Sequence, residues 1–194
     1  MEFKFPEGGT PLDPDEIEGL LIPTISTRYE LDTFEFENNR RASEWVDTIR
    51  TSDILVEPFI RKLHKKMFGD VWRWAGKYRT SNKSIGVFWE MIPEEIGVLL
   101  GNVHFWVKER SIPDDEIGAR FHHRLVSIHP FSNGNGRHGR LMTDLLMEKI
   151  LKTDKFSWGD ANLSQEGDMR ARYIEALIEA DNLNFVPLIE FVRK

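Results

Sequence analysis

Apolar residues recur at intervals of three and four along much of the chain, which is the period of amphipathic helices. The first such segment runs from about Thr33 to Arg50, with apolar positions at Phe34, Ala42, Trp45 and Ile49. Asp32 and Glu35 suit an N-cap and the carboxylate that returns to it. We therefore expect this helix to begin at Asp32.

Further helices are predicted along the rest of the chain. One begins near Pro58, because proline suits a first helical turn. The others carry these apolar stripes: Ile96, Leu99, Leu100, Val103 and Val107; Phe121, Leu125 and Ile128; Leu141, Leu145 and Ile150; Tyr173, Ile174, Leu177 and Ala180. Residues 78–92 (YRTSNKSIGVFWEMI) are instead β-branched and aromatic around a polar turn, which predicts a short β-hairpin. The predicted fold is all-α, a helical bundle with one short β-hairpin.

Composition limits the class of protein. The 194 residues suit one domain with a small N-terminal addition. There are no cysteines, which excludes disulfides, thiolate–zinc sites and a cysteine nucleophile. No signal peptide and no apolar run of membrane-spanning length is visible, so a cytoplasmic protein is the default expectation. The net charge of −6 argues against a broad nucleic-acid surface.

The chemistry concentrates in residues 128–140 (IHPFSNGNGRHGR), between two predicted helices. The first should end at His129, because a residue that precedes proline avoids helical geometry. The second should begin near Gly136, and the glycines before it can turn backbone N–H groups toward an anion at the helix start. Two arginines three residues apart on that helix share a face and can both bind phosphate oxygens. The predicted phosphate-binding residues are Gly134, Asn135, Gly136, Arg137 and Arg140.

His129 stands at the rim of this loop and titrates near neutrality, so it can take a proton from a hydroxyl. The plainer alternative is a helix–loop–helix turn with a surface histidine. A zinc site from His122, His123, His129 and His138 is disfavoured, because adjacent residues point about 100° apart on a helix. The tryptophans favour core packing over stacking on a nucleotide base.

The glycine-rich run resembles the signature of the Fic/Doc (Fido) family, H-P-F-x-D/E-G-N-G-R-x-x-R. His129, Pro130, Phe131, Gly134, Asn135, Gly136, Arg137 and Arg140 are in register with it. The segments LHKKMFGDVWRWAGKYR and HHRLVSIHPF also resemble the family, and the likeness covers about Leu55 to Val192. The opening FPEGGTPLDPDE is similar to a Fic subgroup called mobile mystery protein B.

The resemblance implies a protein adenylyltransferase, which moves AMP from ATP to a Ser, Thr or Tyr hydroxyl of a target protein. It implies that His129 deprotonates the hydroxyl, that Phe131 anchors the loop and that the predicted phosphate-binding residues hold ATP. The cofactor would be Mg²⁺ or Mn²⁺. A flap at Thr80, Ile85 and Val87 would dock the target by strand pairing. Residues 1–54 would form an N-terminal arm with an inhibitory helix, and residues 55–194 the Fic-type catalytic domain.

One position departs from the signature. The family has Asp or Glu, which holds Mg²⁺, where this chain has Asn133. An amide oxygen is a weaker ligand for a hard cation than a carboxylate. We therefore expect retained nucleotide binding and a reduced or altered rate.

The first long helix contains Thr33-Phe34-Glu35-Phe36-Glu37-Asn38, which resembles the Fic inhibitory motif S/T-x-x-x-E-G/N. The resemblance implies that Glu37 pairs with Arg140 and occupies the place of the γ-phosphate, so that Glu37→Gly would raise activity. The alternative is a local pair of Glu37 with Arg40 or Arg41 on its own helix.

Other functions stay open beside AMP transfer. Asn133 favours a nucleotide-binding regulatory module with little catalysis. A Fic-type phosphotransferase or de-AMPylase would use the same loop, and a phosphotransferase would move the γ- rather than the α-phosphate. No recognition helix of a DNA-binding regulator is evident, and no membrane partner is expected. Self-association, the target protein and the biological role are not determined by the sequence.

Overall fold

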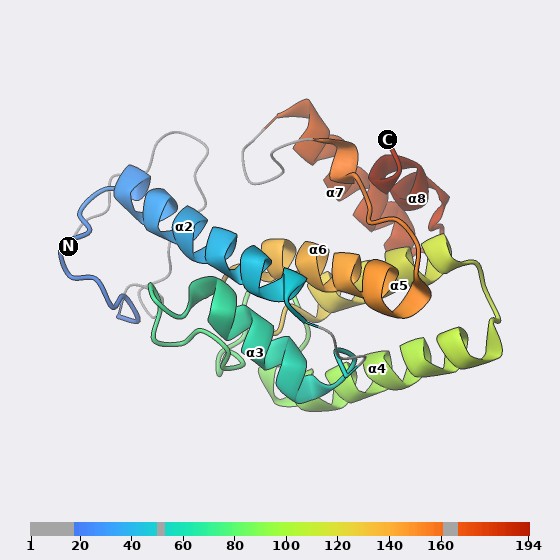
Figure 1. Ribbon diagram of the computed structural model, residues 1–194, viewed down its shortest axis with the longest axis horizontal. Helices are drawn as coiled ribbons and strands as arrows, with labels where there is room; N and C mark the ends of the chain where they lie inside the picture. Colours follow the sequence, from blue (N-terminus) through green and yellow to red (C-terminus); the bar gives the residue numbers. More distant parts are fainter. Residues whose placement is uncertain (1–17, 50–52, 161–166) are drawn as a thin grey trace.

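The protein is a helical bundle with α6 at its centre (Figure 1). The computed structural model describes residues 18–49, 53–160 and 167–194. Its helices are α2 (Arg28–Asp47), α3 (Glu57–Phe68), α4 (Ile92–Glu109), α5 (Asp114–Ile128), α6 (Asn135–Leu145), α7 (Asp168–Asp181) and α8 (Val186–Val192). A π-helical turn (Leu146–Leu151) extends α6, and 3₁₀ turns lie at Trp89–Met91 and Trp158–Asp160. The predicted helical fold is confirmed. Within the described ranges, no helix is long and apolar enough to cross a membrane.

One apolar core joins the N-terminal part of the chain to the predicted catalytic domain. Its centre includes Leu63 of α3, Ile96 of α4 and Phe121 of α5, none of which is exposed. Ile25 and Leu31 belong to the same cluster. The described part of the predicted N-terminal arm therefore packs against the domain that begins at residue 55. A smaller cluster holds α7 and α8 on the other side of α5.

The helix α2 begins earlier than its predicted start at Asp32. Its N-cap is Thr27, whose hydroxyl accepts a hydrogen bond from the Glu30 amide at 3.2 Å. The Glu30 carboxylate returns to the Thr27 amide at 3.0 Å. This capping box satisfies two amides at once, so it outcompetes the start predicted at Asp32. Asp32 lies inside the helix, and the predicted end at Arg50 lies outside the described residues.

Residues 80–88, called the flap here, contain no strand, so the predicted hairpin is not confirmed. The Val87 amide donates to the Ile128 carbonyl at 3.3 Å, at the end of α5. The Trp89 amide donates to the side chain of Asn82 at 3.0 Å. The first of these amides thus pairs with a carbonyl outside the flap and the second with a side chain. Neither takes part in a cross-strand ladder.

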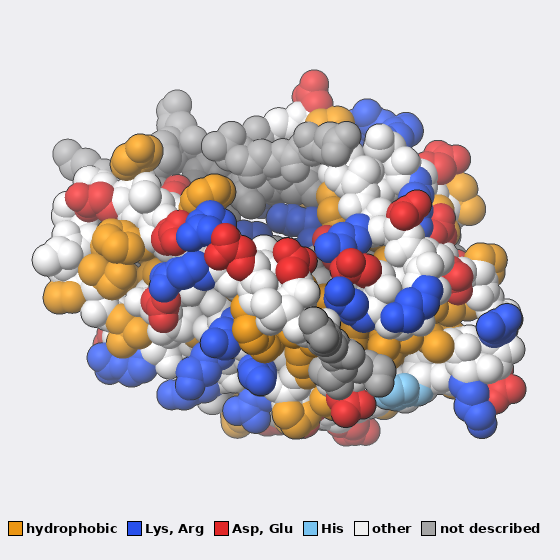
Figure 2. All heavy atoms as spheres, in the orientation of Figure 1, with side chains coloured by type: hydrophobic (Ala, Val, Ile, Leu, Met, Phe, Trp, Pro, Cys, Tyr) orange, Lys and Arg blue, Asp and Glu red, His pale blue; other side chains and the backbone are white. Residues whose placement is uncertain are grey.

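Charges are unevenly spread over the face that carries α2 and α3. Lys and Arg side chains gather over α3, and positive and negative side chains alternate over α2 (Figure 2). Along α2 these include pairs within the helix, such as that of Arg40 with Glu37 at 2.8 Å. The exposed side of α2 is therefore a solvated, mixed-charge surface.

Candidate active site

The loop between α5 and α6 is shaped by two residues in the left-handed region. His129 ends α5 with a φ of 53°, and Gly134 precedes α6 with a φ of 78°. A Cβ on Gly134 would lie 2.5 Å from the ring of Phe68, so only glycine fits there. The predicted boundaries at His129 and near Gly136 are therefore correct to within a residue or so.

Phe131 and Asn135 fix the shape of this loop. The Phe131 ring is fully buried and stacks on His64, with 3.7 Å between ring centroids. The Asn135 side chain accepts from the Phe131 amide at 2.9 Å and donates to the Phe131 carbonyl at 2.8 Å. The amide group of Asn135 is thus used within the loop, which leaves its main-chain N–H as the donor that a phosphate can reach.

The start of α6 offers unpaired backbone donors. The first amide of α6 with a partner in the helix is that of His138, which donates to the Gly134 carbonyl at 2.9 Å. The amides of Asn135, Gly136 and Arg137 precede it, and no side chain caps the helix. This end of α6 is the positive end of its dipole, which suits an anion.

Arg137 and Arg140 add two neighbouring cations to that end of α6. The pKa of Arg140 is lowered by burial and by the positive charge of Arg137. The Tyr173 hydroxyl acts in the opposite direction and raises the pKa of Arg140. The two positive charges repel each other. An anion bound between them would be attracted by both guanidiniums and would offset that repulsion.

His129 is half-buried at the end of α5, where the loop begins. Burial, together with the positive charges of Arg79 and Lys83, lowers the pKa of His129 to about 4. The imidazole is therefore neutral at pH 7, which is the form that accepts a proton. The position and protonation state both suit the predicted role of a base, and that role stays a prediction.

The predicted pair of Glu37 with Arg140 is wrong. Glu37 is exposed and pairs with Arg40 at 2.8 Å and with Arg41 at 3.7 Å. The reason is the phase of α2, whose residues at helical spacing from Leu31 face the core while Glu37 faces solvent. The local alternative is what the structure contains.

A different carboxylate of α2 reaches the anion site. Glu35 is 4% exposed, and one of its oxygens lies 2.7 Å from Nη1 of Arg137. Its other oxygen accepts from Nε1 of the buried Trp72 at 2.6 Å. The predicted capping role of Glu35 is also wrong, because Thr27 and Glu30 form the capping box. The sequence does contain an indication of where Glu35 lies: it follows Leu31 by four residues, which places its carboxylate on the apolar face of the helix.

Asn133 does not fit a magnesium site. Its amide oxygen accepts from the Gly134 amide at 2.6 Å, and its carbonyl accepts from Nε2 of His64 at 3.0 Å. Across the described ranges, no group of three or more His, Cys, Asp or Glu side chains could hold a metal ion.

The other histidines have structural partners. His122 is fully buried, and its Nε2 lies 2.6 Å from the Tyr173 hydroxyl. Nε2 of His138 donates to the Ile60 carbonyl at 3.0 Å. These two ring nitrogens are therefore used within the fold.

The predicted target-docking residues differ in exposure. Thr80 is exposed and Ile85 is 60% exposed, whereas Val87 is half-buried. Arg79, directly before the flap, was not singled out by the sequence and is 2% exposed. Ile85 is thus the predicted flap residue most available to a partner.

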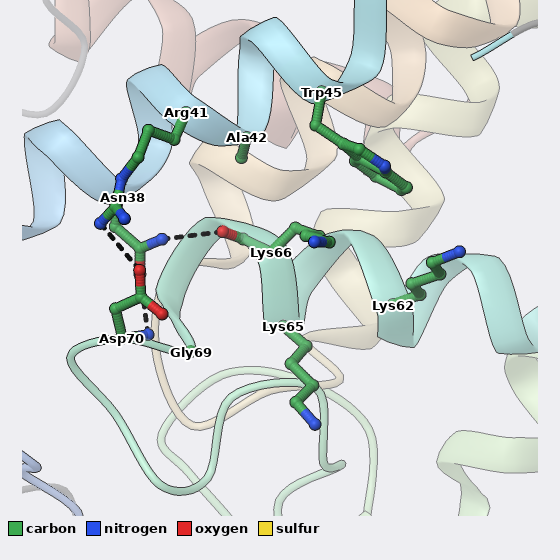
Figure 3. A pocket seen from close by; sticks show the side chains of 9 residues that line it. All are labelled: Asn38, Arg41, Ala42, Trp45, Lys62, Lys65, Lys66, Gly69 and Asp70. Carbon is green, nitrogen blue, oxygen red and sulfur yellow. Dashed lines mark hydrogen bonds and ion pairs between the residues drawn. The ribbon is translucent and has the colours of Figure 1, made fainter. Parts of the chain in front are cut away.

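A basic cavity of about 560 Å³ lies apart from these residues, in the groove between α2 and α3 (Figure 3). Lys62, Lys65 and Lys66 line it, with Trp45 on the α2 side. Asn38 crosses the groove, donating to the Lys66 carbonyl at 2.9 Å. This contact joins α2 to α3 and thereby helps to hold Glu35 over Arg137.

The comparisons with known proteins agree with this geometry. A model of the Fic/DOC family matches residues 54–147, which include the loop from His129 to Arg140. This part of the chain, residues 54–147, is therefore similar to the Fic/DOC family. Protein adenylyltransferase fic-1 of Caenorhabditis elegans is 28% identical over 186 residues, covering 91% of this chain and 34% of that protein. This chain therefore spans about a third of the length of that curated relative.

Solved Fic domains share the fold. The N-terminal Fic domain of a Bartonella quintana protein, with bound ADP, has a TM-score of 0.68 at 18% identity, over 88% of this chain and 86% of that one. A Fic-domain signaling protein of Bacteroides thetaiotaomicron has a TM-score of 0.67 at 17% identity, over 82% and 66%. At these identities the likeness is one of fold.

Proposed function

We propose that this protein transfers AMP from ATP to a hydroxyl side chain of a target protein. The observation that carries the proposal is the junction of α5 and α6, which brings a neutral imidazole at His129, unpaired amides and two guanidiniums into one loop and the first turn of α6. The adenylyltransferase relatives and the ADP-bound Fic domain support the choice of an adenine nucleotide.

In the proposed reaction the target oxygen attacks the α-phosphorus of ATP. His129 takes the hydroxyl proton, an O–P bond forms to the target, and the bond from the α-phosphorus to the bridging oxygen breaks. Pyrophosphate leaves with the electrons of that bond. The amides at the start of α6 hold the α-phosphate, and Arg137 and Arg140 hold the β- and γ-phosphates. Such a transfer depends mainly on positioning and charge neutralisation.

We further propose that Glu35 restrains this activity. A phosphate that binds Arg137 must replace the Glu35 carboxylate, which holds the guanidinium at 2.7 Å. This is competition between two anions for one guanidinium. Glu35, rather than Glu37, is the residue whose removal should open the site.

The test is radiolabel transfer from ATP to proteins of a lysate or to the protein itself, in Mg²⁺ and in Mn²⁺. The parent is compared with Glu35→Gln, with the exposed Glu37→Gln as matched control and with His129→Ala. We expect α-label transfer that rises in Glu35→Gln, stays at the parental level in Glu37→Gln and is lost in His129→Ala. Transfer of the γ-label would indicate a phosphotransferase, and equal transfer by His129→Ala would contradict the assigned base.

The second candidate is a nucleotide-binding regulatory module with little catalysis. Asn133, in place of a carboxylate, favours it because the amide oxygen is already used by the Gly134 amide. This candidate predicts that Glu35→Gln binds ATP more tightly than the parent while no label is transferred under either metal. The same set of proteins therefore separates the two functions.

A further inference from the structure

One buried arginine outside the anion site ties the flap to the end of α5. Nε of Arg79 donates to the His129 carbonyl at 2.7 Å, and its Nη1 donates to the Ser81 carbonyl at 2.8 Å. Its Nη2 donates to the Val87 carbonyl and, at 3.4 Å, to that of Ile128. A single guanidinium thus joins both ends of the flap to the loop that carries the imidazole.

The charge of Arg79 is not explained by an ion pair. Burial lowers the pKa of Arg79, and no carboxylate in the described part of the chain offsets that shift. A buried cation without a counter-charge is costly, and an apolar side chain of similar volume would stabilise a core better. Unlike an apolar residue, this arginine can donate hydrogen bonds to backbone carbonyls. Its role is therefore to hold those backbone segments in place.

The backbone that Arg79 holds is strained and closely packed. His129 has a φ of 53°, a left-handed conformation that is unfavourable for a residue with a Cβ. Gly86 of the flap, with a φ of 103°, lies against it, since a Cβ there would be 2.8 Å from the His129 Cβ and 2.7 Å from Nη2 of Arg79. The Arg79 amide also donates to the Pro130 carbonyl at 3.0 Å. Flap, arginine and imidazole backbone therefore meet at one junction.

Resting on the transfer reaction above, we propose that Arg79 is a positioning residue that sets the flap and His129 as one unit. A target segment docked on the flap then presents its hydroxyl at a fixed distance from the imidazole. Arg79 touches neither nucleotide nor reacting atoms and acts through the carbonyls of His129, Ser81 and Val87. Its charge and that of Lys83, which both act on His129, help to keep the imidazole neutral.

The test compares two changes at the junction with a matched control. Arg79→Gln removes the charge and most of the donors, and Gly86→Ala pushes the flap away without changing any charge. The control is Arg193→Gln, because Arg193 also ties a loop by donating to two carbonyls, those of Asp154 and Lys155 at 3.1 Å each. Arg79→Lys keeps the charge and loses the planar fork of donors.

Four readouts are measured: ATP affinity by calorimetry, kcat and KM for AMP transfer, the NMR titration of labelled His129, and hydrogen exchange of the Val87 amide. Arg79→Gln and Gly86→Ala should each lower kcat by about 100-fold, the effect of a misplacement of about 1 Å, while ATP affinity stays within about twofold. In Arg79→Gln, His129 should titrate at a higher pH and the Val87 amide should exchange faster. Arg79→Lys should lower kcat with little change in that titration, and Arg193→Gln should change none of the four.

The proposal would be overturned if Arg79→Gln kept the parental kcat, the parental titration of His129 and the parental exchange rate of the Val87 amide. So would a parallel loss of ATP affinity, thermal stability and kcat in Arg79→Gln and Gly86→Ala, because that pattern reports general unfolding. If the parent transfers no AMP, the proposed function fails by itself. The titration of His129 and the exchange of Val87 then still decide whether Arg79 holds flap and loop together.

Discussion

Replacing Glu35 by glutamine isolates one contact of the anion site. The glutamine oxygen can still accept the hydrogen bond that Nε1 of Trp72 gives to Glu35 at 2.6 Å. The pair with Arg137, at 2.7 Å, loses its negative charge. Alanine would be a poorer choice, since it would also strand a buried tryptophan donor, at about 1–3 kcal/mol.

The expected effect on ATP affinity follows from what the phosphate must displace. A hydrogen bond to a charged group contributes about 1.5–3 kcal/mol, and Arg137 is buried enough to keep most of that value, at 29% exposure of its side chain. Each 1.4 kcal/mol is a factor of ten in affinity, so ATP should bind Glu35→Gln about 10- to 100-fold more tightly than it binds the parent.

Calorimetric titration of ATP into the parent, Glu35→Gln and Glu37→Gln measures this effect. Glu37 is the matched control because it lies on the same helix and pairs with Arg40 instead. Its replacement should leave the affinity within about twofold, as for an exposed pair. Equal affinity in all three proteins would refute the competition between Glu35 and phosphate, and tighter binding in Glu37→Gln alone would restore the pairing predicted from the motif.

Two further predictions concern the buried polar groups around α6. Tyr173→Phe should lower the free energy of unfolding by about 1–3 kcal/mol in urea and weaken ATP binding, because His122 and Arg140 both lose the hydroxyl. Burial lowers the pKa of His122 to about 3 and that of His138 to about 4. Since the unfolded chain then binds more protons below about pH 6.5, stability should fall as the pH drops from 7 to 5, by roughly 2 kcal/mol for each histidine. The pKa of Asp144, raised to about 6 by burial, opposes part of that fall; denaturation midpoints that are equal at pH 7 and 5 would contradict the prediction.

The loop from His129 to Arg140 could be predicted because its constraints are local. A proline ends one helix, Gly134 allows a positive φ, and the next helix begins directly afterwards. Arginines three residues apart share a face whatever packs around them. The sequence could not predict that the Asn135 amide would turn inward to the Phe131 backbone, because that depends on how deeply the loop is buried.

On α2 the phase of the helix, rather than the match to the inhibitory motif, decides which side chains face the core. The spacing Thr33 to Glu37 matches the inhibitory pattern, yet the buried residues of the helix are Leu31, Glu35, Asn38, Ala42 and Val46. Glu37 is on the other side of that series. Polar side chains are usually exposed, yet Glu35 and Asn38 lie on the buried face of α2. Their positions indicate where the helix contacts polar groups of its neighbours.

The predicted hairpin is not confirmed, for a different physical reason. Its composition suits strands, but the carbonyls of Ser81 and Val87 receive their hydrogen bonds from the Arg79 guanidinium. A side chain thus supplies what a neighbouring strand would supply, and no residue pattern within the flap reveals it. The arginine directly before this apolar, turn-rich segment was the one indication in the sequence. Its role becomes apparent only in the structure, where the end of α5 lies against the flap.

The arginines near the loop differ in what a nucleotide would have to disturb. Arg79 donates to carbonyls and Arg140 lies by the Tyr173 hydroxyl, and both contacts can remain when phosphates arrive. Arg137 is held by the Glu35 carboxylate, which phosphate must replace. Because Asn38 holds α2 to the Lys66 carbonyl, the smallest movement that admits ATP is a rotation of the Glu35 side chain rather than release of the helix. The restraint should therefore behave as a competition that high ATP concentration overcomes, and loosening α2 should weaken it without abolishing the fold.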